Sequence, residues 1–308
     1  MELIRGLHNL RDRHRGCALA IGNFDGLHRG HQELLAHARE HGRKLGVPST
    51  AMFFEPTPRE FFTPDRAPPR ISEFRDKMRR FERVGMDRLI CLRFDAGLAA
   101  MSAESFVDDL ILDRLGARAV VVGVDFRYGA NRMGDSAQLR QHVTARGAVA
   151  DIVDAVMAGN ERCSSTAIRE AMATADLDRI ERQLGRRHSM IGRVRHGLKL
   201  GRKLGMRTAN IHLRHVPALR LGIYAVVGWA TGERRRWSGV ASLGVRPTVG
   251  GTRPLLETHF FDNSDDWYGR EIEIEFVRYL RPEMHFDSLE ALAEQMQRDA
   301  AQARMLLA

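Results

Sequence analysis

Short apolar runs alternate with stretches of helical period along residues 1–185. The apolar runs that have the length of buried β-strands are Cys17–Ile21, Ser49–Phe54, Arg88–Leu92, Ala119–Gly123 and Ala148–Val153. Between them, apolar positions recur with the period of an amphipathic helix over 30–44, 72–84, 102–115 and 135–146. Strands that alternate with helices are joined by crossover connections, so we expect an α/β domain with a doubly wound parallel sheet.

A different pattern follows residue 185. Two short helical stretches, 165–173 and 176–184, come before the change. Strand-like segments then dominate, at 189–195, 222–230, 236–243, 256–261 and 271–280. Glycine and proline punctuate the gaps between these segments, which is typical of a small antiparallel β-barrel.

The chain is predicted to end in an amphipathic helix over 288–305, opened by a capping box of Asp287 and Glu290. The apolar face of this helix carries Leu289, Leu292, Met296 and Ala300. The change of pattern near residue 185 predicts two domains, 1–185 with the parallel sheet and 186–308 with the barrel.

The composition is that of a soluble globular protein. Of 308 residues, 44% are hydrophobic and 28% are charged, which argues against disorder. No apolar run approaches the roughly 20 residues that span a bilayer, and the N-terminal segment lacks the apolar core of a secretory signal. Cys17, Cys91 and Cys163 are too few and too widely spaced for a disulfide framework or a four-ligand zinc site. We therefore expect a cytoplasmic protein.

The net charge narrows the partners to anions. Lysine and arginine number 48 against 39 acidic residues, a formal charge of +9. Such a balance attracts nucleic acid, anionic membranes or small phosphate-bearing substrates, and does not choose among them. The basic residues are spread along the chain rather than gathered in a tail.

The segment Ile21–His31 joins the first predicted strand to the first predicted helix. Its three glycines let the backbone approach a ligand closely. His31 would lie at the helix start, where free N–H groups favour an anion, and His28 is close enough to point at the same phosphate. An ordinary glycine turn is the alternative, which the density of these residue types disfavours.

Ser164–Arg169 has the composition of a second anion site. Hydroxyl groups open a predicted helix, and a guanidinium follows one turn later. Taken alone, a segment of this kind is more often a plain serine or threonine helix cap. Because Ser164–Arg169 follows the histidine segment in the same predicted domain, we expect it to bind phosphate.

The histidine segment resembles the G-x-F-D-x-x-H-x-G-H signature of nucleotidylyltransferases, and most closely the FAD synthetase half of bacterial bifunctional riboflavin kinase/FAD synthetases. Further segments match that family in order, at 54–58, 123–129 with Arg132, 134–135 and 164–169. The resemblance covers essentially the whole chain. It implies that the phosphate of FMN attacks the α-phosphate of ATP, with magnesium bridging phosphate oxygens and pyrophosphate leaving.

The resemblance also implies residue roles in adenylyl transfer, with His28 and His31 as the catalytic donors. The implied ATP-binding residues are Gly22, Phe24, Asp25, Gly26, His28, Gly30, His31, Ser164, Ser165, Thr166 and Arg169. The implied FMN-binding residues are Asp125, Phe126, Arg127 and Arg132.

The second half carries a loop of glycines and cations at 201–210. The order of a Walker A loop is absent. Thr208 and Asn210 offer oxygen ligands suited to magnesium, although such residues are also common in turns. Glu257 lies in a predicted strand, where an exposed strand charge is the ordinary interpretation.

This loop resembles the riboflavin kinase signature G-R-x-L-G-x-P-T-A-N, and matches continue in order at 222–225, 239–249, 256–259, 267–270 and 280–283. The resemblance implies that Glu257 is the general base and that Thr208 and Asn210 hold magnesium. The implied ATP-binding residues are Gly201, Arg202, Gly205, Thr208 and Asn210, and the implied flavin-binding residues are Arg281 and Phe286. Two positions depart from the family: Arg207 stands in place of proline, and Ser242 in place of asparagine.

The expected function is phosphorylation of riboflavin to FMN, followed by adenylylation of FMN to FAD. An alternative is an FMN adenylyltransferase whose kinase domain is impaired by Arg207. Another class, a basic nucleic-acid-binding protein, is disfavoured because aromatic residues make up 7% and form no stacking platform. Small molecules (riboflavin, FMN and ATP) are the expected partners, with no nucleic acid or membrane, and oligomerisation is left open.

Overall fold

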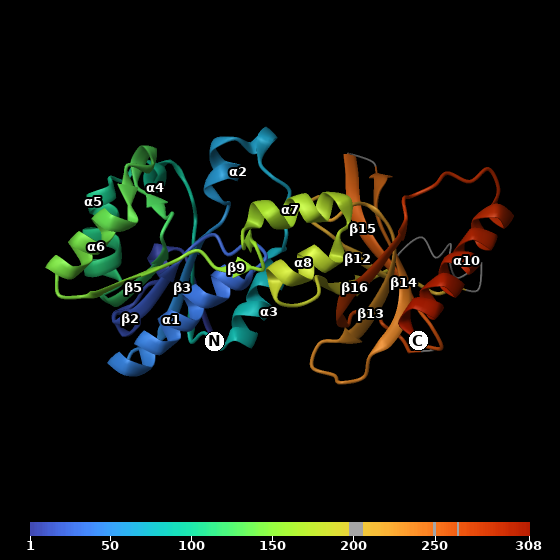
Figure 1. The fold of residues 1–308 in the computed structure, drawn as a ribbon, viewed down its shortest axis with the longest axis horizontal. Helices are drawn as coiled ribbons and strands as arrows, with labels where there is room; N and C mark the ends of the chain where they lie inside the picture. Colours follow the sequence, from blue (N-terminus) through green and yellow to red (C-terminus); the bar gives the residue numbers. More distant parts are fainter. Residues whose placement is uncertain (197–205, 249–250, 264) are drawn as a thin grey trace. The chain divides into compact units, whose positions relative to one another are not determined.

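A computed structural model describes residues 1–196, 206–248, 251–263 and 265–308 (Figure 1). The chain divides into two compact units: residues 1–68 with 77–164, and residues 69–76 with 165–308. The second unit thus includes residues that precede the predicted boundary at 185. The boundary at residue 185 was predicted to separate the two activities, and this division of activities stays a prediction.

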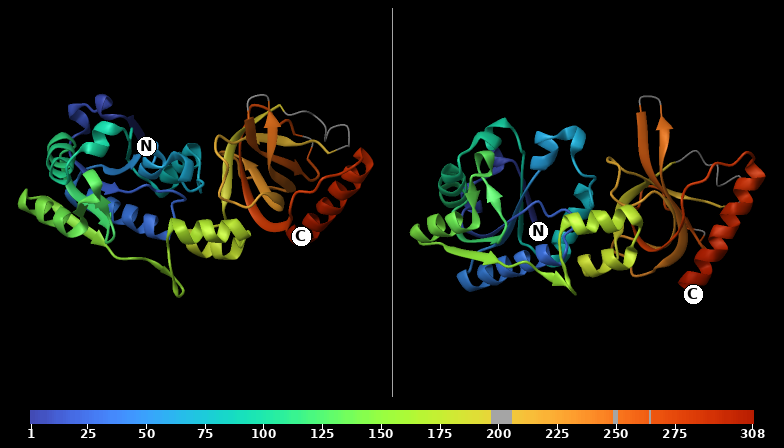
Figure 2. Two further views of the ribbon diagram at one scale, coloured as in Figure 1. Left: turned by 90° about the horizontal axis from the view of Figure 1, so that it is seen from above. Right: turned by 45° about the horizontal axis from the view of Figure 1, so that its top comes forward.

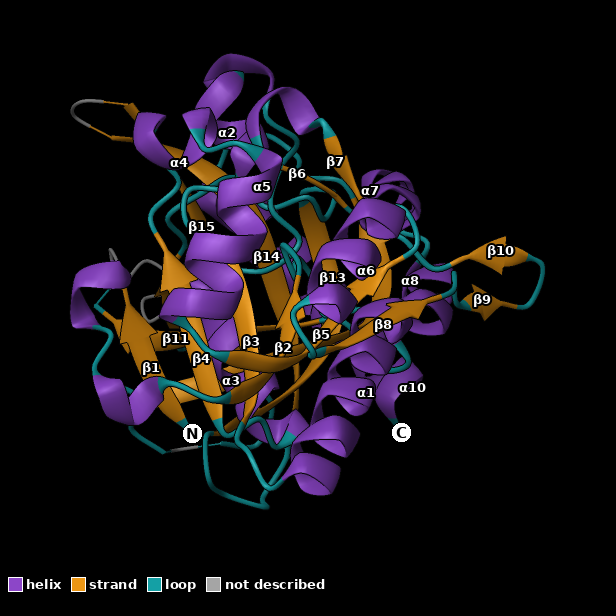
Figure 3. Ribbon diagram, turned by 90° about the vertical axis from the view of Figure 1, so that its left-hand side faces the viewer, coloured by secondary structure: helices purple, strands orange, loops and turns teal. Residues whose placement is uncertain are grey.

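The first unit is built on a six-stranded sheet in the order β1-β4-β3-β2-β5-β8, which can be followed across Figure 3. All of its strand pairs are parallel. The strands are β1 Glu2–Arg5, β2 Cys17–Ile21, β3 Ser49–Phe54, β4 Arg88–Leu92, β5 Ala117–Gly123 and β8 Val149–Val153. The predicted parallel sheet is confirmed. The edge strand β1 was missed because only Ile4 of its residues is buried.

Helices connect these strands. They are α1 Arg29–Leu45, α2 Pro58–Phe62, α3 Phe74–Val84, α4 Ala96–Ala100, α5 Ala103–Ser105, the π-helical segment Phe106–Arg114 and α6 Ser136–Ala145. Strand β2 is buried along its whole length, as expected for a parallel strand with both faces covered. Two short hairpins were not predicted: β6 Arg127–Tyr128 with β7 Gly134–Asp135, and β9 Met157–Ala158 with β10 Glu161–Arg162.

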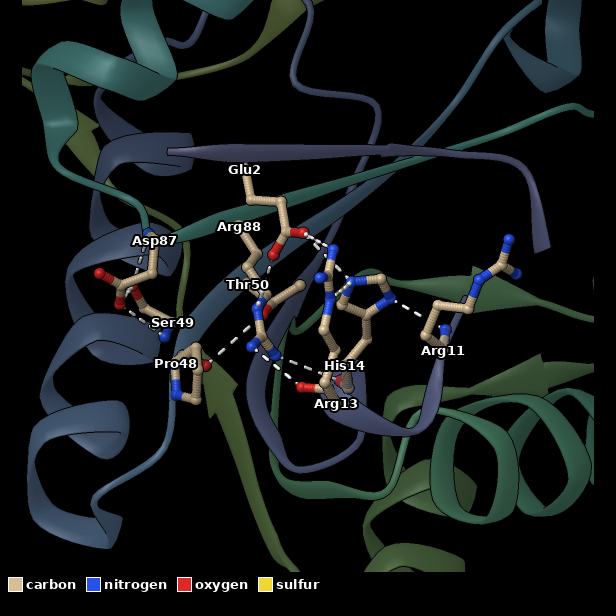
Figure 4. Close-up of polar contacts among 9 residues, drawn as sticks. All are labelled: Glu2, Arg11, Arg13, His14, Pro48, Ser49, Thr50, Asp87 and Arg88. Carbon is tan, nitrogen blue, oxygen red and sulfur yellow. Dashed lines mark hydrogen bonds and ion pairs between the residues drawn. The ribbon is translucent and has the colours of Figure 1, made fainter. Parts of the chain in front are cut away.

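Polar contacts tie together the amino ends of β1, β3 and β4 (Figure 4). Glu2 accepts hydrogen bonds from Arg13 at 3.0 Å and from the buried His14 at 3.1 Å. The backbone N–H and the hydroxyl of Ser49 donate to Asp87 at 2.9 and 2.7 Å. Because these groups satisfy one another, they serve the fold. Ligands of such sheets bind at the opposite, carboxyl edge.

The second unit contains a closed antiparallel barrel in the order β11-β12-β15-β14-β13-β16, drawn from two further sides in Figure 2. Its strands are β11 Ser189–Arg195, β12 Ala209–His212, β13 Gly222–Ala230, β14 Trp237–Thr248, β15 Gly251–Phe260 and β16 Glu271–Arg281. The predicted barrel is confirmed. Strand β12, which is only four residues long, was not predicted.

Three helices belong to the barrel unit: α7 Ser165–Thr174, α8 Leu177–Leu184 and α10 Leu289–Leu307. Ile168 of α7 and Ile180 of α8 share one hydrophobic core with Ile274 of the barrel. The predicted capping box of α10 is wrong. Ser288 is the N-cap and accepts a hydrogen bond from the N–H of Ala291, because its short hydroxyl lies next to the free N–H groups.

Candidate active sites

The loop from Gly22 to His28 lies at the carboxyl end of β2, between that strand and α1. It is held in an unusual backbone conformation, with φ of 49° at Phe24, 84° at Gly26 and 44° at Leu27. Positive φ in bulky residues costs of order 1–3 kcal/mol each and persists only where packing enforces it. Phe24 and Leu27 are fully buried, so their side chains anchor the loop while its backbone follows the sheet edge.

Two histidines close this loop at the start of α1. His28 is the N-cap: its Nδ1 accepts the N–H of His31 at 3.3 Å, and the two rings stack with centroids 3.6 Å apart. In neutral His28 the proton is therefore on Nε2. A Cβ at Gly30 would lie 3.2 Å from the His28 ring, so glycine leaves room for this stacking. The predicted pair is brought together, beside the buried Asp25.

Electrostatics keep His31 neutral at pH 7. Burial, and then the charges of His28 and Lys77, lower the pKa of His31 well below its ordinary value. Its Nδ1 is buried and has no hydrogen-bond partner among the residues that the structure describes. An imidazole whose Nδ1 atom is buried and unused, at a helix N-terminus, is suited to contact a ligand there.

The predicted FMN-binding residues follow β5, the strand beside β2. Strand β2 connects through α1 to β3 on one side, and β5 lies on its other side. The strand order therefore reverses between β2 and β5, and parallel sheets of this kind bind ligands at the point of reversal. Asp125 pairs with Arg162 at 2.8 Å, and Arg127 with Asp135 at 3.2 Å. Phe126 stacks on the buried Tyr128, and Arg132 has a φ of 59°.

The predicted phosphate segment 164–169 is divided between the two units. Ser164 ends the first unit, while Ser165, Thr166 and Arg169 lie on α7 of the second. Arg169 donates from Nε to the carbonyl of Pro69 at 2.8 Å and from a terminal nitrogen to the carbonyl of Ser165 at 3.3 Å. Its guanidinium is thus fixed within the second unit.

In the barrel, cross-strand pairing places three polar side chains on one face. Glu257 of β15 is paired with Asn210 of β12 on one side and with Ser242 of β14 on the other. Paired residues of antiparallel strands point to the same face of the sheet. The neighbouring pair Ile211 and Leu256 belongs to the barrel core, so Glu257 points to the outer face.

A cavity of about 590 Å³ lies over this outer face, beneath α10. It is lined by Glu257, Thr208, Ser242, Arg281 and Phe286, and by Leu289, Leu292, Met296 and Asp299 from the N-cap side and face of α10. A site of this volume suits a molecule the size of a flavin. The apolar α10 face predicted from the sequence is therefore partly a cavity-facing surface.

Arg281 is fixed at the cavity by a residue that sequence reasoning missed. Asp299 of α10 accepts two hydrogen bonds from Arg281, at 2.8 and 2.6 Å, and a third from Gln295 at 2.9 Å. The Asp299 side chain is only 5% exposed. Such a bidentate pair orients the guanidinium, which lies 6.0 Å from the ring centre of Phe286.

A second, smaller cavity of about 200 Å³ lies beside Thr208 and Asn210. The Asn210 amide donates to the carbonyl of Thr208 at 3.1 Å and to its hydroxyl at 3.3 Å. The Asn210 Oδ1 atom is buried, and no described residue hydrogen-bonds to it. The carbonyl of Arg207 lies 2.9 Å from Nδ1 of His259. The predicted ATP-binding residues Gly201, Arg202 and Gly205 lie outside the described residues.

Two family models match the chain: FAD synthetase over residues 10–167 and riboflavin kinase over residues 184–307. The chain belongs to the bifunctional riboflavin kinase/FMN adenylyltransferase family. The protein of that name from Pseudomonas fluorescens is 45% identical over 100% of this chain and 98% of its own length. Its counterpart from Escherichia coli strain K12 is 43% identical over 99% of this chain and 97% of its own length.

A solved structure agrees over the same extent. The crystal structure of a Streptococcus pneumoniae protein, described as a macrolide-efflux protein, has a TM-score of 0.79 at 26% identity over 99% of both chains. The word efflux applies to that protein and is not carried over. In the part of this chain that the structure describes, no helix is long and apolar enough to cross a membrane. The comparisons confirm the family resemblance and the class of enzyme that the sequence led us to expect, a bifunctional riboflavin kinase/FMN adenylyltransferase. The expected fold class is confirmed as well.

Proposed function

We propose that the chain phosphorylates riboflavin with ATP to give FMN, and then adenylylates FMN with a second ATP to give FAD and pyrophosphate. The observation that carries this proposal is that each matched family region contains its own site. The histidine loop lies in the FAD synthetase region, and the cavity with Glu257 lies in the riboflavin kinase region. Two sites of different construction in one chain are what two consecutive transfers require.

For the kinase step, Glu257 is the proposed general base. It lines the larger cavity with Arg281 and Phe286, the proposed flavin-binding residues. A carboxylate there accepts the proton of the riboflavin 5′-hydroxyl as the oxygen attacks the γ-phosphorus of ATP. Thr208 lines both cavities, so the proposed nucleotide side and flavin side meet at this residue. A cavity that brings Glu257 together with Thr208 and Arg281 favours an active kinase over the impaired one.

Magnesium is proposed at Thr208 and Asn210, and the residues fit it. Asn210 Oδ1 is a buried oxygen acceptor without a hydrogen-bond partner among the described residues, and the Thr208 hydroxyl lies 3.3 Å from the same amide group. Oxygen ligands of this kind suit Mg²⁺, which would neutralise phosphate charge when bound. The Thr208 and Asn210 side chains then orient the nucleotide against Glu257, with the loop residues Gly201, Arg202 and Gly205 as further proposed ATP contacts.

For adenylyl transfer, the proposed role of the protein is to position two anions. The phosphate oxygen of FMN forms a bond to the α-phosphorus of ATP while the bond to pyrophosphate breaks. His28 and neutral His31 supply hydrogen-bond donors at the N-terminus of α1, where the helix favours negative charge. The β5 loop with Asp125 and Arg127 is the proposed FMN side.

Further ATP contacts in this step remain those proposed from the sequence. They are Gly22, Phe24, Asp25, Gly26 and Gly30 of the histidine loop and Ser164, Ser165, Thr166 and Arg169 at the start of α7. The proposed division of activities, 1–185 and 186–308, agrees closely with the matched regions. Small molecules are the proposed partners, with no role for nucleic acid.

The test crosses two variants with two substrates. His31→Ala is expected to form FMN from riboflavin normally and to lose about 10²–10³-fold in FAD formation. Glu257→Gln keeps its shape, is expected to lose about 10²–10⁴-fold in FMN formation, and still converts supplied FMN to FAD. Chromatography of the flavins after incubation with ATP and Mg²⁺ measures both. Unaltered protein that forms neither product, or variants that affect the opposite step, would refute the assignment.

A further inference from the structure

Lys77 of α3 is a buried cation next to the histidine loop. Its side chain is only 1% exposed, and lysine is almost never fully buried without a partner. The ammonium donates one hydrogen bond, at 3.3 Å, to the backbone carbonyl of Asn23. It also lies 5.7 Å from the ring centre of Phe53. The sequence pattern predicts only an ordinary amphipathic helix at this residue.

The positive charge of Lys77 has no ion-pair partner among the residues that the structure describes. The carbonyl of Asn23 is neutral, and the charge of Lys77 acts to lower the pKa of the His31 imidazole and of the Cys91 thiol. Burial, and then Glu55, raise the pKa of Cys91 to about 11, so this thiol is neutral too. No salt bridge joins Lys77 to that glutamate. A buried charge without a counter-ion destabilises a protein unless something else compensates it.

Packing connects this charge to the proposed nucleotide site. Phe81, one turn after Lys77 on the same face of α3, lies 5.3 Å from the ring of Phe24. The Phe24 ring in turn lies 5.2 Å from the ring of His31. Lys77 itself holds Asn23, the residue before Phe24. One face of α3 therefore supports the loop that carries the two histidines.

We infer that Lys77 is a positioning residue of the adenylyl-transfer centre, and that the phosphates of bound ATP balance its otherwise uncompensated charge. This inference rests on the proposed function of the first unit. The lysine fixes the loop through the Asn23 carbonyl, and its charge disfavours a second cation at His31. The site thus keeps a neutral imidazole as donor and a fixed positive charge behind it, which attracts a polyanion.

Lys77→Met tests the inference, because methionine fills a similar volume without charge. The KM for ATP in FAD formation is expected to rise at least about tenfold, since the phosphates of ATP lose the positive charge that they balance. Riboflavin phosphorylation is expected to stay unchanged. The free variant is expected to melt at or above the temperature of the unaltered protein, because an unpaired buried charge is removed. The rise in melting temperature caused by ATP or inorganic pyrophosphate is expected to shrink.

Lys44→Met is the matched control. Lys44 also lies in the first unit and loses the same charge, but its side chain is 65% exposed and paired with Glu40. It is expected to leave the KM for ATP and the pyrophosphate-induced shift unchanged. An NMR titration of His31 gives a readout independent of activity: its pKa is expected to rise in Lys77→Met and not in Lys44→Met.

The outcomes separate the inference from the proposed function. Unaltered protein that forms no FAD from FMN overturns the proposed function. FAD formation by Lys77→Met with an unchanged KM for ATP overturns only the role of the lysine. A free variant that melts well below the unaltered protein, or that keeps the full pyrophosphate-induced shift, shows that Lys77 only supports the fold and also overturns the inference.

Discussion

Asp299→Asn is expected to weaken both the barrel unit and its proposed flavin site. Asp299 is 4% exposed and accepts two hydrogen bonds from Arg281. Asparagine keeps the shape, but its NH₂ group faces a guanidinium N–H, so one charge-assisted hydrogen bond is lost and the other is weakened. Hydrogen bonds to charged groups contribute about 1.5–3 kcal/mol each, so we expect a total loss of about 3 kcal/mol.

For a unit of this size, each kcal/mol shifts the melting temperature by roughly 2–4 °C, so the barrel transition should fall by roughly 6–12 °C. Scanning calorimetry measures this shift. Because Arg281 lines the larger cavity, the KM for riboflavin should rise as well. Conversion of supplied FMN to FAD should not change, since that site belongs to the other family region.

The chain offers a matched control in an exposed aspartate that also pairs with an arginine, here one of α10. Arg304 of α10 pairs with Asp262 at 2.7 and 3.2 Å, but the Asp262 side chain is 79% exposed. Asp262 has a φ of 52°, which asparagine tolerates, so Asp262→Asn should produce no measurable shift. If Asp299→Asn melts like Asp262→Asn and binds riboflavin normally, the buried pair does not hold the cavity and the reasoning fails.

Two further predictions concern pH and the departure at residue 207. Although burial lowers the pKa of His37, its hydrogen bond and attraction to Asp151, 2.9 Å away, raise it overall. This contact therefore stabilises fully below the unfolded pKa of about 6.5 and is lost as pH rises through the folded value. Melting temperatures of the first unit should fall from pH 6 to 8 more in unaltered protein than in His37→Gln, and parallel curves would contradict this. Arg207→Pro should keep kinase activity, because proline retains the carbonyl that meets His259. If φ at residue 207 is already near −65°, proline should also stabilise by about 0.4–1 kcal/mol, because it restricts the unfolded chain. Melting and ATP saturation measure both effects, and an inactive native kinase restored by proline would refute the prediction.

Local pattern was enough to predict most of the architecture. Strand β2 is apolar throughout, and a run of this kind buries itself whatever its neighbours are. The histidine loop was equally predictable, because His28 and His31 are close in sequence and a single turn brings them together. In the six-stranded sheet and the barrel, the strands missed are β1 and β12, which are four residues long and too short to show a period.

The tertiary structure alone decided which distant residues share a site. Glu257 is an unremarkable strand residue until the barrel register pairs it with Asn210 on the outer face. Asp299 and Lys77 each occupy a helix whose pattern predicts only which side is apolar. That pattern cannot predict that Asp299 pairs with Arg281 at a cavity. Nor can it predict that Lys77 donates a hydrogen bond to Asn23 of the histidine loop. Hydrophobic period records burial of a face, whereas pairing of charges depends on which chain segments packing brings within a few ångströms.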